Sequence, residues 1–553
     1  MLRDSTPSRR PKRVLIDKPG FFDLIDEELW WSEPGNQADA AIHRICTLFR
    51  KMQVGTVYLE HLKPGALVAE EVDAISQRAG SKVGASLVRL SAFYGKVRRP
   101  IDPRRYLGYA AVLRLHFRGG AKRSYVLEAV VRLPATTDAG TLEPHYLMNN
   151  YLHTARQYTG SVDGEEYPLL GTMFCQQNNL TSVCAHACLR MAISNTLGPS
   201  DPPLTTEWMN SHVLKVDHAK KPFGQAPGES TTHGGMTEEQ MWSVALACGF
   251  SPKFWNFFDN PNVEYQDVVY PLVESGLPTL LEFTTGSRGT CHVVPVLGHT
   301  LNTDCWYPQA EPAYSQDFRP VFEPHISSSR WVDHFVISDD NFGPYLCLPT
   351  LSLRKTTVPR WDGQFRALNV TGLFPQPVGY TSVPVEWKAA VVYWGFVLQA
   401  SVDPLLSNPW LTRMAPEADK MLELGYRRPW PVFRILLAKK ADYSQHVRQT
   451  VYGSQSLPTE LTAVEAALPD LFWLCEATLP DLYTGNKTKL AEILIGAGTP
   501  GDKGDDPPLL LARFPGFWAI PKAGNIDILT DPQLLKHTPL FELPCTFRPH
   551  IEW

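Results

Sequence analysis

The feature that most constrains the fold is the segment between Gln176 and Gly198, where an amide-rich loop leads into an apolar stretch. Cys184 and Cys188 lie one helical turn apart, and Gly198 is a typical helix stop, which predicts a helix over residues 184–196. A thiol in the first turn of a helix lies at the positive end of the helix dipole, which favours the thiolate. The segment alone fits a buried structural cysteine equally well.

The composition describes a folded protein of several domains. A chain of 553 residues is too long for one core, so about two to four domains are expected. The hydrophobic fraction is 44%, and the net charge of −5 gives no reason to expect nucleic-acid binding. The longest apolar run, residues 389–398, is too short to span a membrane. Ten cysteines without a secretion signal predict free thiols and a cytoplasmic location.

Periodicity divides the chain into four expected regions. They are a basic flexible tail (1–19), an α+β domain (20–150), a central domain (151–350) and a mixed α/β domain (351–553). In the first domain, helices are expected at 40–53 and 68–78, and strands at 85–94, 108–117 and 123–133. In the last region, strands are expected at 389–399, 432–438, 471–478 and 508–514, helices at 458–467 and 487–497, and an exposed loop at 499–508.

The central domain carries the most informative order of elements. Thr237 and Gln240 fit a capping box that starts a helix, and Gly249 ends it. Another helix is expected near 265–275, and apolar strands follow it. Helices that precede a run of antiparallel strands are typical of a two-lobed α+β domain.

Two residues on these strands could serve a thiol nucleophile. His292 opens a strand after a glycine-containing loop, and Asp339 ends the next strand, so antiparallel pairing would bring them together. A cysteine nucleophile needs an imidazole to exchange its proton and an acid or amide to orient that imidazole. Gln177, upstream of Cys184, could supply an amide N–H as an oxyanion donor. The order of these residues therefore predicts a Cys184–His292–Asp339 site.

The central segment resembles papain-like cysteine peptidases, especially the peptidase domains of bacteriocin exporters (double-glycine leader peptidases) and their free-standing relatives. Residues 184–187 are similar to the nucleophile motif, with Ala185 where glycine is usual. Residues 292–294 are similar to the His-x-Val-Val strand. Residues 337–339 are similar to the segment of the orienting acid, with Asp340 where proline is usual. The resemblance covers about a third of the chain.

This resemblance implies a papain-like peptidase domain flanked by two mixed α/β domains. Cys184 would be the nucleophile, His292 the base, Asp339 the orienting acid and Gln177 the oxyanion donor. The family spacing from glutamine to cysteine is six residues, whereas Gln177 and Gln176 lie seven and eight residues before Cys184. The implied substrate is a protein or peptide, no metal or organic cofactor is required, and the oligomeric state stays open.

Other assignments compete for individual residues. Cys184, Cys188, Cys291 and His292 could form a zinc site. His186 could face solvent beside the site or pack in the core. His299 could replace His292 as the base, and Asp340 could replace Asp339. His334 is expected outside the site, with Cys175 and Cys291 as lining residues.

Two other functions fit the same residues. A papain-like acyltransferase or glutamine deamidase would use the same triad and the same acyl-enzyme. A catalytically inactive interaction module would explain why the sequence departs from the family motif at Ala185, at Asp340 and in the glutamine spacing.

Overall fold

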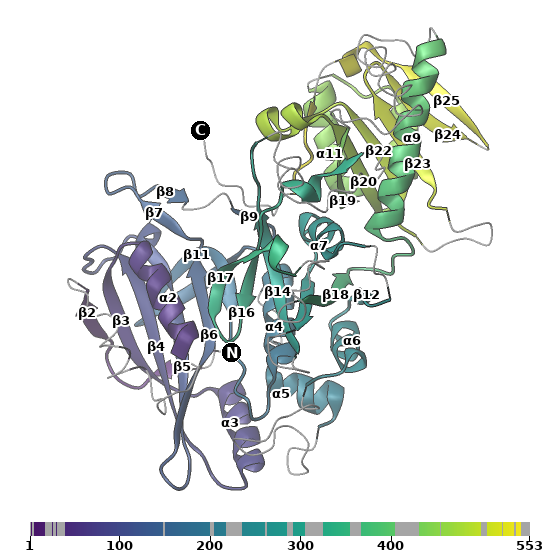
Figure 1. Cartoon of the computed structure of the whole chain (residues 1–553). Helices are drawn as coiled ribbons and strands as arrows, with labels where there is room; N and C mark the ends of the chain where they lie inside the picture. The colour runs from purple at the N-terminus through teal and green to yellow at the C-terminus, as the bar shows by residue number, and fades with distance from the viewer. Residues whose placement is uncertain are drawn as a thin grey trace, which may run out of the picture.

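The computed structural model defines three large β-sheets with helices packed on them (Figure 1). It describes residues 2, 5–16, 25, 29, 39–146, 150–198, 204–216, 235–259, 263–284, 291–304, 325–353, 366–403, 431–453, 455–498, 506–522, 524–535 and 538–543.

The first sheet has eight antiparallel strands in the order β1-β3-β4-β5-β6-β11-β10, with β2 also paired to β3. Its strands are β1 (Thr6–Pro7), β2 (Lys12–Leu15), β3 (Val54–Lys63), β4 (Gly84–Tyr94), β5 (Tyr106–His116), β6 (Lys122–Arg132), β10 (Arg156–Val162) and β11 (Glu165–Phe174). Helix α2 (Asp39–Lys51) covers one face and α3 (Ala66–Ala79) covers the other. Alternating side chains explain this, because Val88 of β4 joins the core under α2 and Leu87 joins the core under α3.

The second sheet has seven strands in the order β12-β18-β13-β14-β16-β17, and β9 pairs with β14. They are β9 (Asn150–Leu152), β12 (Ser251–Asn256), β13 (Thr279–Thr284), β14 (Cys291–Thr300), β16 (His334–Asp339), β17 (Gly343–Pro349) and β18 (Arg366–Phe374). Helices α4 (Cys184–Leu197) and α6 (Glu238–Ala247) pack on the face that includes Leu280 and Val293. Helix α7 (Tyr265–Glu274) packs on the opposite face, which includes Leu281 and Val294.

The third sheet has the order β15-β19-β20-β22-β23-β24-β25 and is antiparallel except for the β15–β19 pair. Its strands are β15 (Ile326–Ser327), β19 (Val432–Lys439), β20 (Leu471–Thr478), β22 (Ala491–Gly496), β23 (Leu509–Phe514), β24 (Phe517–Lys522) and β25 (Asn525–Thr530). Helix α9 (Ser382–Val402) packs on one face, and α11 (Lys440–Val447) and α12 (Thr459–Ala467) pack on the other. Two small pairs complete the strands: β7 (Ala135–Thr137) with β8 (Pro144–Tyr146), and β21 (Thr488–Lys489) with β26 (Thr538–Pro539).

The second sheet lies between the other two (Figure 1). One continuous apolar core contains residues of α7, of α9 and of the second and third sheets. These two sheets are therefore not separated by solvent. The first sheet meets the second through Tyr345 of β17, whose hydroxyl donates to the Val131 carbonyl (2.8 Å) and accepts from the Thr172 N–H (2.9 Å). The second sheet is therefore held on both sides.

The expected α+β class is confirmed, with mostly antiparallel sheets. Among the described residues, no helix is long and apolar enough to cross a membrane. The sheets do not follow the expected ranges, because β10 and β11 join the first sheet although they follow residue 150. In the same way, β18 joins the second sheet although it follows residue 350. The tail expected at 1–19 contains two short strands that pair with β3.

Most expected elements of the flanking regions are present, but two are wrong. The strand predicted at 389–399 is part of the 21-residue helix α9, and the helix predicted at 487–497 contains β21 and the central strand β22. A continuous run of Val, Tyr, Trp and Phe does not reveal its period, and the segment forms a helix that packs on the third sheet and α7. The high helix propensity of residues in β22 is overridden by the pairing of this strand with β20 and β23. The loop expected at 499–508 lies mostly outside the described residues.

Candidate active site

The loop before Cys184 is organised by the buried side chain of Asn178. Its Oδ1 accepts from three consecutive backbone N–H groups, those of Leu180, Thr181 and Ser182, at 2.8–3.1 Å. Its Nδ2 donates to Glu71 of α3 at 3.3 Å. A buried asparagine that caps its own loop fixes the path of the backbone into the next helix. The sequence analysis missed this residue, although Asn followed by Leu-Thr-Ser is a typical Asx-turn pattern.

A second buried pair fixes the first turn of α4. The His186 Nδ1 accepts from the Val183 N–H (3.3 Å), and Nε2 lies 2.8 Å from Asn210 Oδ1. Asn210 in turn donates to the Thr181 carbonyl at 2.8 Å. His186 is only 1% exposed, so the solvent-facing alternative is wrong and the ring is structural. The half-buried Cys184 follows Val183, whose side chain has no polar atom to cap the helix. The N–H groups of His186 and Ala187 donate to the Val183 carbonyl, which leaves those of Cys184 and Ala185 as the candidates to face an oxyanion.

The structure brings His292 together with both candidate acids. Its Nε2 lies 3.1 Å from Oδ1 of Asp339 and 3.5 Å from Oδ1 of Asp340. The backbone N–H of Asn341 donates to Asp339 Oδ1 at 2.9 Å and fixes that carboxylate. Strand pairing produces this arrangement, because β14 and β16 run antiparallel and His292 begins one while Asp339 ends the other. The expected proximity of His292 and Asp339 is present.

The electrostatics of the site favour a charged imidazole beside the thiol. Burial lowers the pKa of His292, but the proximity of Asp339 and Cys184 and the charges of both aspartates outweigh it and raise the pKa to about 11. The ring therefore keeps both protons at neutral pH. Cys184 is among the groups that raise the pKa of this ring. A positive imidazolium near a thiol is the arrangement on which cysteine nucleophiles depend.

Asp340 differs from Asp339 in its environment. It is 2% exposed, and burial raises its pKa to about 7, against the lowering effect of His292 and with a further increase from Asp339. Asp340 is therefore partly protonated near neutral pH. Asp339, which is closer to His292 and held by the Asn341 N–H, is the better placed of the two to orient the ring.

The two glutamines have different surroundings. Gln176 extends the pairing of the first sheet, since its Oε1 accepts from the Val126 N–H at 2.8 Å and its own N–H donates to the Val126 carbonyl. The Gln177 amide donates to Asn341 Oδ1 at 3.4 Å, next to the two aspartates. Gln177 is therefore the glutamine that contacts the turn of the two acids.

The other competing residues lie elsewhere. His299 is 1% exposed and bonds Glu274, and His334 lies at the opposite end of β16 from Asp339. Cys188 points into the α4 core, and burial raises its pKa well above the usual value. Cys291 is exposed and lies near enough to Cys184 to be influenced by its charge, which fits a lining residue.

Two groups of side chains could hold a metal ion in the parts of the chain that the structure describes, and neither contains a cysteine. One is His292 with Asp339 and Asp340, and the other is His153 with Glu274 and His299. In each group the ligand atoms lie within 4.8 Å of one another. The zinc site considered for the cysteines is therefore not among them.

Comparisons with known proteins give no assignment. The chain matches no protein-family model, and no curated protein or solved structure is significantly similar to it.

Proposed function

We propose that the chain is a papain-like thiol peptidase that acts through Cys184, His292 and Asp339. The observation that carries the proposal is the position of His292, which has Asp339 Oδ1 3.1 Å from Nε2 and whose pKa is raised by Asp339 and Cys184. A cysteine at the start of a helix, a charged imidazole and a carboxylate are the three parts that thiol proteolysis needs. A papain-like two-lobed fold and a cytoplasmic location belong to the proposal, on the sequence grounds given above.

In this mechanism, the Cys184 thiolate attacks the carbonyl carbon of the scissile bond, and the oxygen becomes an oxyanion. Backbone N–H groups of the first turn of α4 stabilise that charge, with the Gln177 amide as a second donor. The imidazolium of His292 gives its proton to the leaving amine, and the acyl group stays on sulfur. His292 then takes a proton from water, which hydrolyses the thioester and regenerates the thiol. Asp339 keeps the ring oriented through both steps.

A mass-spectrometric digest tests the proposal. Wild-type protein is incubated with a complex peptide mixture, and new termini are compared with those produced by Cys184→Ala. Cys291→Ser is the matched control, because it removes a neighbouring exposed thiol and leaves the proposed triad intact. New termini from wild type and Cys291→Ser, absent with Cys184→Ala, support a peptidase. Equal patterns from all three proteins would reject it.

The same digest separates the two remaining enzymatic alternatives and the inactive module. Glutamine side chains that lose ammonia or gain an added amine indicate deamidation or acyl transfer, because the acyl-enzyme forms at a side-chain amide and not at the backbone. No change in any peptide indicates the interaction module.

A metal-dependent hydrolase is the second candidate function, because His292, Asp339 and Asp340 could ligate a cation. In the described structure, His292 Nε2 and both Asp340 carboxylate oxygens have no hydrogen bond of good geometry. A chelator distinguishes the two functions: the thiol mechanism is insensitive to it and is blocked by iodoacetamide, whereas a metal hydrolase loses activity on chelation.

A further inference from the structure

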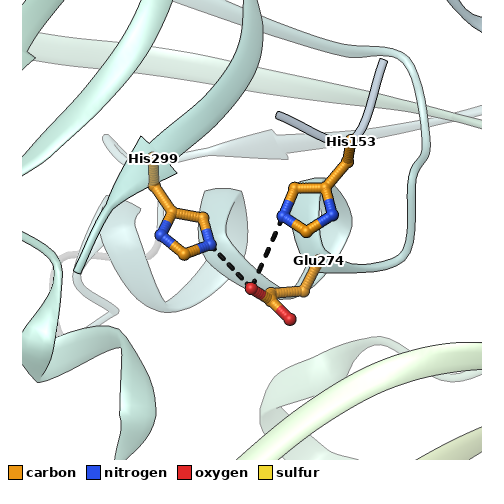
Figure 2. Close-up of side chains that lie close together, drawn as sticks. All are labelled: His153, Glu274 and His299. Atoms are coloured by element: carbon orange, nitrogen blue, oxygen red, sulfur yellow. Dashed lines mark hydrogen bonds and ion pairs between the residues drawn. The ribbon is translucent and has the colours of Figure 1, made fainter. Parts of the chain in front are cut away.

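A second group of titratable side chains lies where the second sheet meets the third. It contains His153 just after β9, Glu274 at the end of α7 and His299 on β14. The two histidines are 1% exposed and Glu274 is 4% exposed. Figure 2 shows both imidazole rings directed toward the carboxylate from different elements. The Nε2 atoms lie 2.6 Å (His299) and 3.5 Å (His153) from the same oxygen, Glu274 Oε1.

Each ring nitrogen of His299 faces an oxygen atom. The other ring nitrogen of His299, Nδ1, lies 3.0 Å from the Thr300 carbonyl, which can only accept. A neutral His299 that donates from Nδ1 would therefore direct an Nε2 lone pair at a carboxylate oxygen. A metal ion bound by both atoms would use this lone pair, with Nε2 and Oε1 moved apart from their 2.6 Å contact.

The groups around the cluster hold the ligand atoms in place. Thr300 orients His299, and Arg434 of β19 binds the other carboxylate oxygen of Glu274, with Nε at 2.8 Å from Oε2. Outer contacts of this kind orient histidine and carboxylate ligands in metal sites. Arg434 also pairs with Glu476, so its charge is shared between two carboxylates.

We propose that His153, Glu274 and His299 form a binding site for a divalent transition-metal ion of the zinc class. Two imidazoles and one carboxylate are a ligand set that suits Zn²⁺, with water as the fourth ligand. The ligands come from three elements of the second sheet region, and Arg434 of the third sheet holds the carboxylate, so the ion would strengthen this junction. The site is separate from Cys184, and its test does not depend on the peptidase proposal.

The test is the zinc content of the full-length protein after incubation with Zn²⁺ and removal of free metal by gel filtration. Wild type is expected to retain about one zinc per chain. His299→Gln is expected to bind at least about tenfold more weakly, since loss of a ligand should cost no less than loss of an outer contact. The matched control is His292→Gln, which removes the imidazole from the other three-residue group, and it should retain the metal.

Cobalt binding keeps the proposal testable if His299→Gln does not fold. Wild-type protein titrated with Co²⁺ should show the visible bands of tetrahedral cobalt without the intense sulfur-to-metal charge-transfer absorption of a cysteine ligand. Retention of those bands in His292→Gln supports the site. Absence of stoichiometric zinc and of tetrahedral cobalt bands in wild type would overturn the proposal. Loss of metal in His292→Gln with retention in His299→Gln would equally overturn it.

Discussion

Replacing Asp339 by asparagine tests which of the two adjacent acids holds His292 in its charged form. The substitution preserves the side-chain shape and the oxygen that accepts from the Asn341 N–H, but it removes a negative charge 3.1 Å from Nε2. A hydrogen bond to a charged group contributes about 1.5–3 kcal/mol. The thiolate–imidazolium pair should therefore lose about 10- to 150-fold in relative population.

The assay is the pH dependence of Cys184 alkylation by iodoacetamide, followed by peptide mass spectrometry. In Asp339→Asn, the acid limb of the rate profile should move by about 1–2 pH units to higher pH. The imidazolium form of His292 is less stable without the carboxylate, so it stabilises the thiolate less. At pH 6 the alkylation rate should fall by about 10- to 100-fold.

Asp340→Asn is the matched control, since it makes the same change one residue later. The pKa of Asp340 is about 7, so its side chain is mostly neutral at pH 6. Replacing it by the neutral amide of asparagine therefore removes little negative charge at this pH. We expect the rate at pH 6 to change less than about threefold, a difference of under 1 kcal/mol. A larger loss in Asp340→Asn than in Asp339→Asn would refute the assignment of the orienting acid.

Three further predictions concern stability, each measured by urea unfolding. Folded Asp340 binds its proton more tightly than the unfolded chain does, so the free energy of unfolding falls as pH rises from about 4 to about 7. Asp340→Asn should therefore stabilise the protein more at pH 8 than at pH 5, by about 2–3 kcal/mol. An equal gain at both pH values would contradict the raised pKa. Asn178→Ala leaves three buried backbone N–H groups without their acceptor and should cost about 2–4 kcal/mol; a loss below about 0.5 kcal/mol would show that the loop does not depend on this side chain. Tyr345→Phe removes the hydroxyl that bridges the first and second sheets and should cost about 1–3 kcal/mol, whereas a neutral effect would show that the two sheets do not depend on it.

The sequence predicted the local elements of the site better than their long-range support. The helix beginning at Cys184 and the capping box of Thr237 and Gln240 are confirmed, because both depend on residues within a few positions of one another. Asp339 and His292 could be related through antiparallel pairing of two expected strands. The contact between Gln177 and Asn341 could not be predicted, since it depends on how a loop of one region meets a turn 164 residues away.

Larger errors arose where packing overrides propensity. The apolar run in α9 was predicted as a strand because it lacks helical periodicity, yet it forms a helix that packs on the third sheet and α7 and leaves Trp387 and Val391 exposed. The buried histidine cluster was equally hidden, because His153 lies more than a hundred residues before Glu274 and His299, and only the pairing of β9 with β14 brings it to them. Sheet order, which no single sequence segment specifies, determines both features.

The most direct test of the central claim is the identity of the cysteine that iodoacetamide labels first at mildly acidic pH. Burial raises the pKa of the seven other cysteines in the described part of the chain, including Cys175 to about 12 and Cys248 to about 11. The account predicts rapid, selective labelling of Cys184 that is lost in His292→Ala and retained in His299→Gln. Slow and uniform labelling of all ten cysteines, or labelling of Cys184 that is unchanged in His292→Ala, would contradict it.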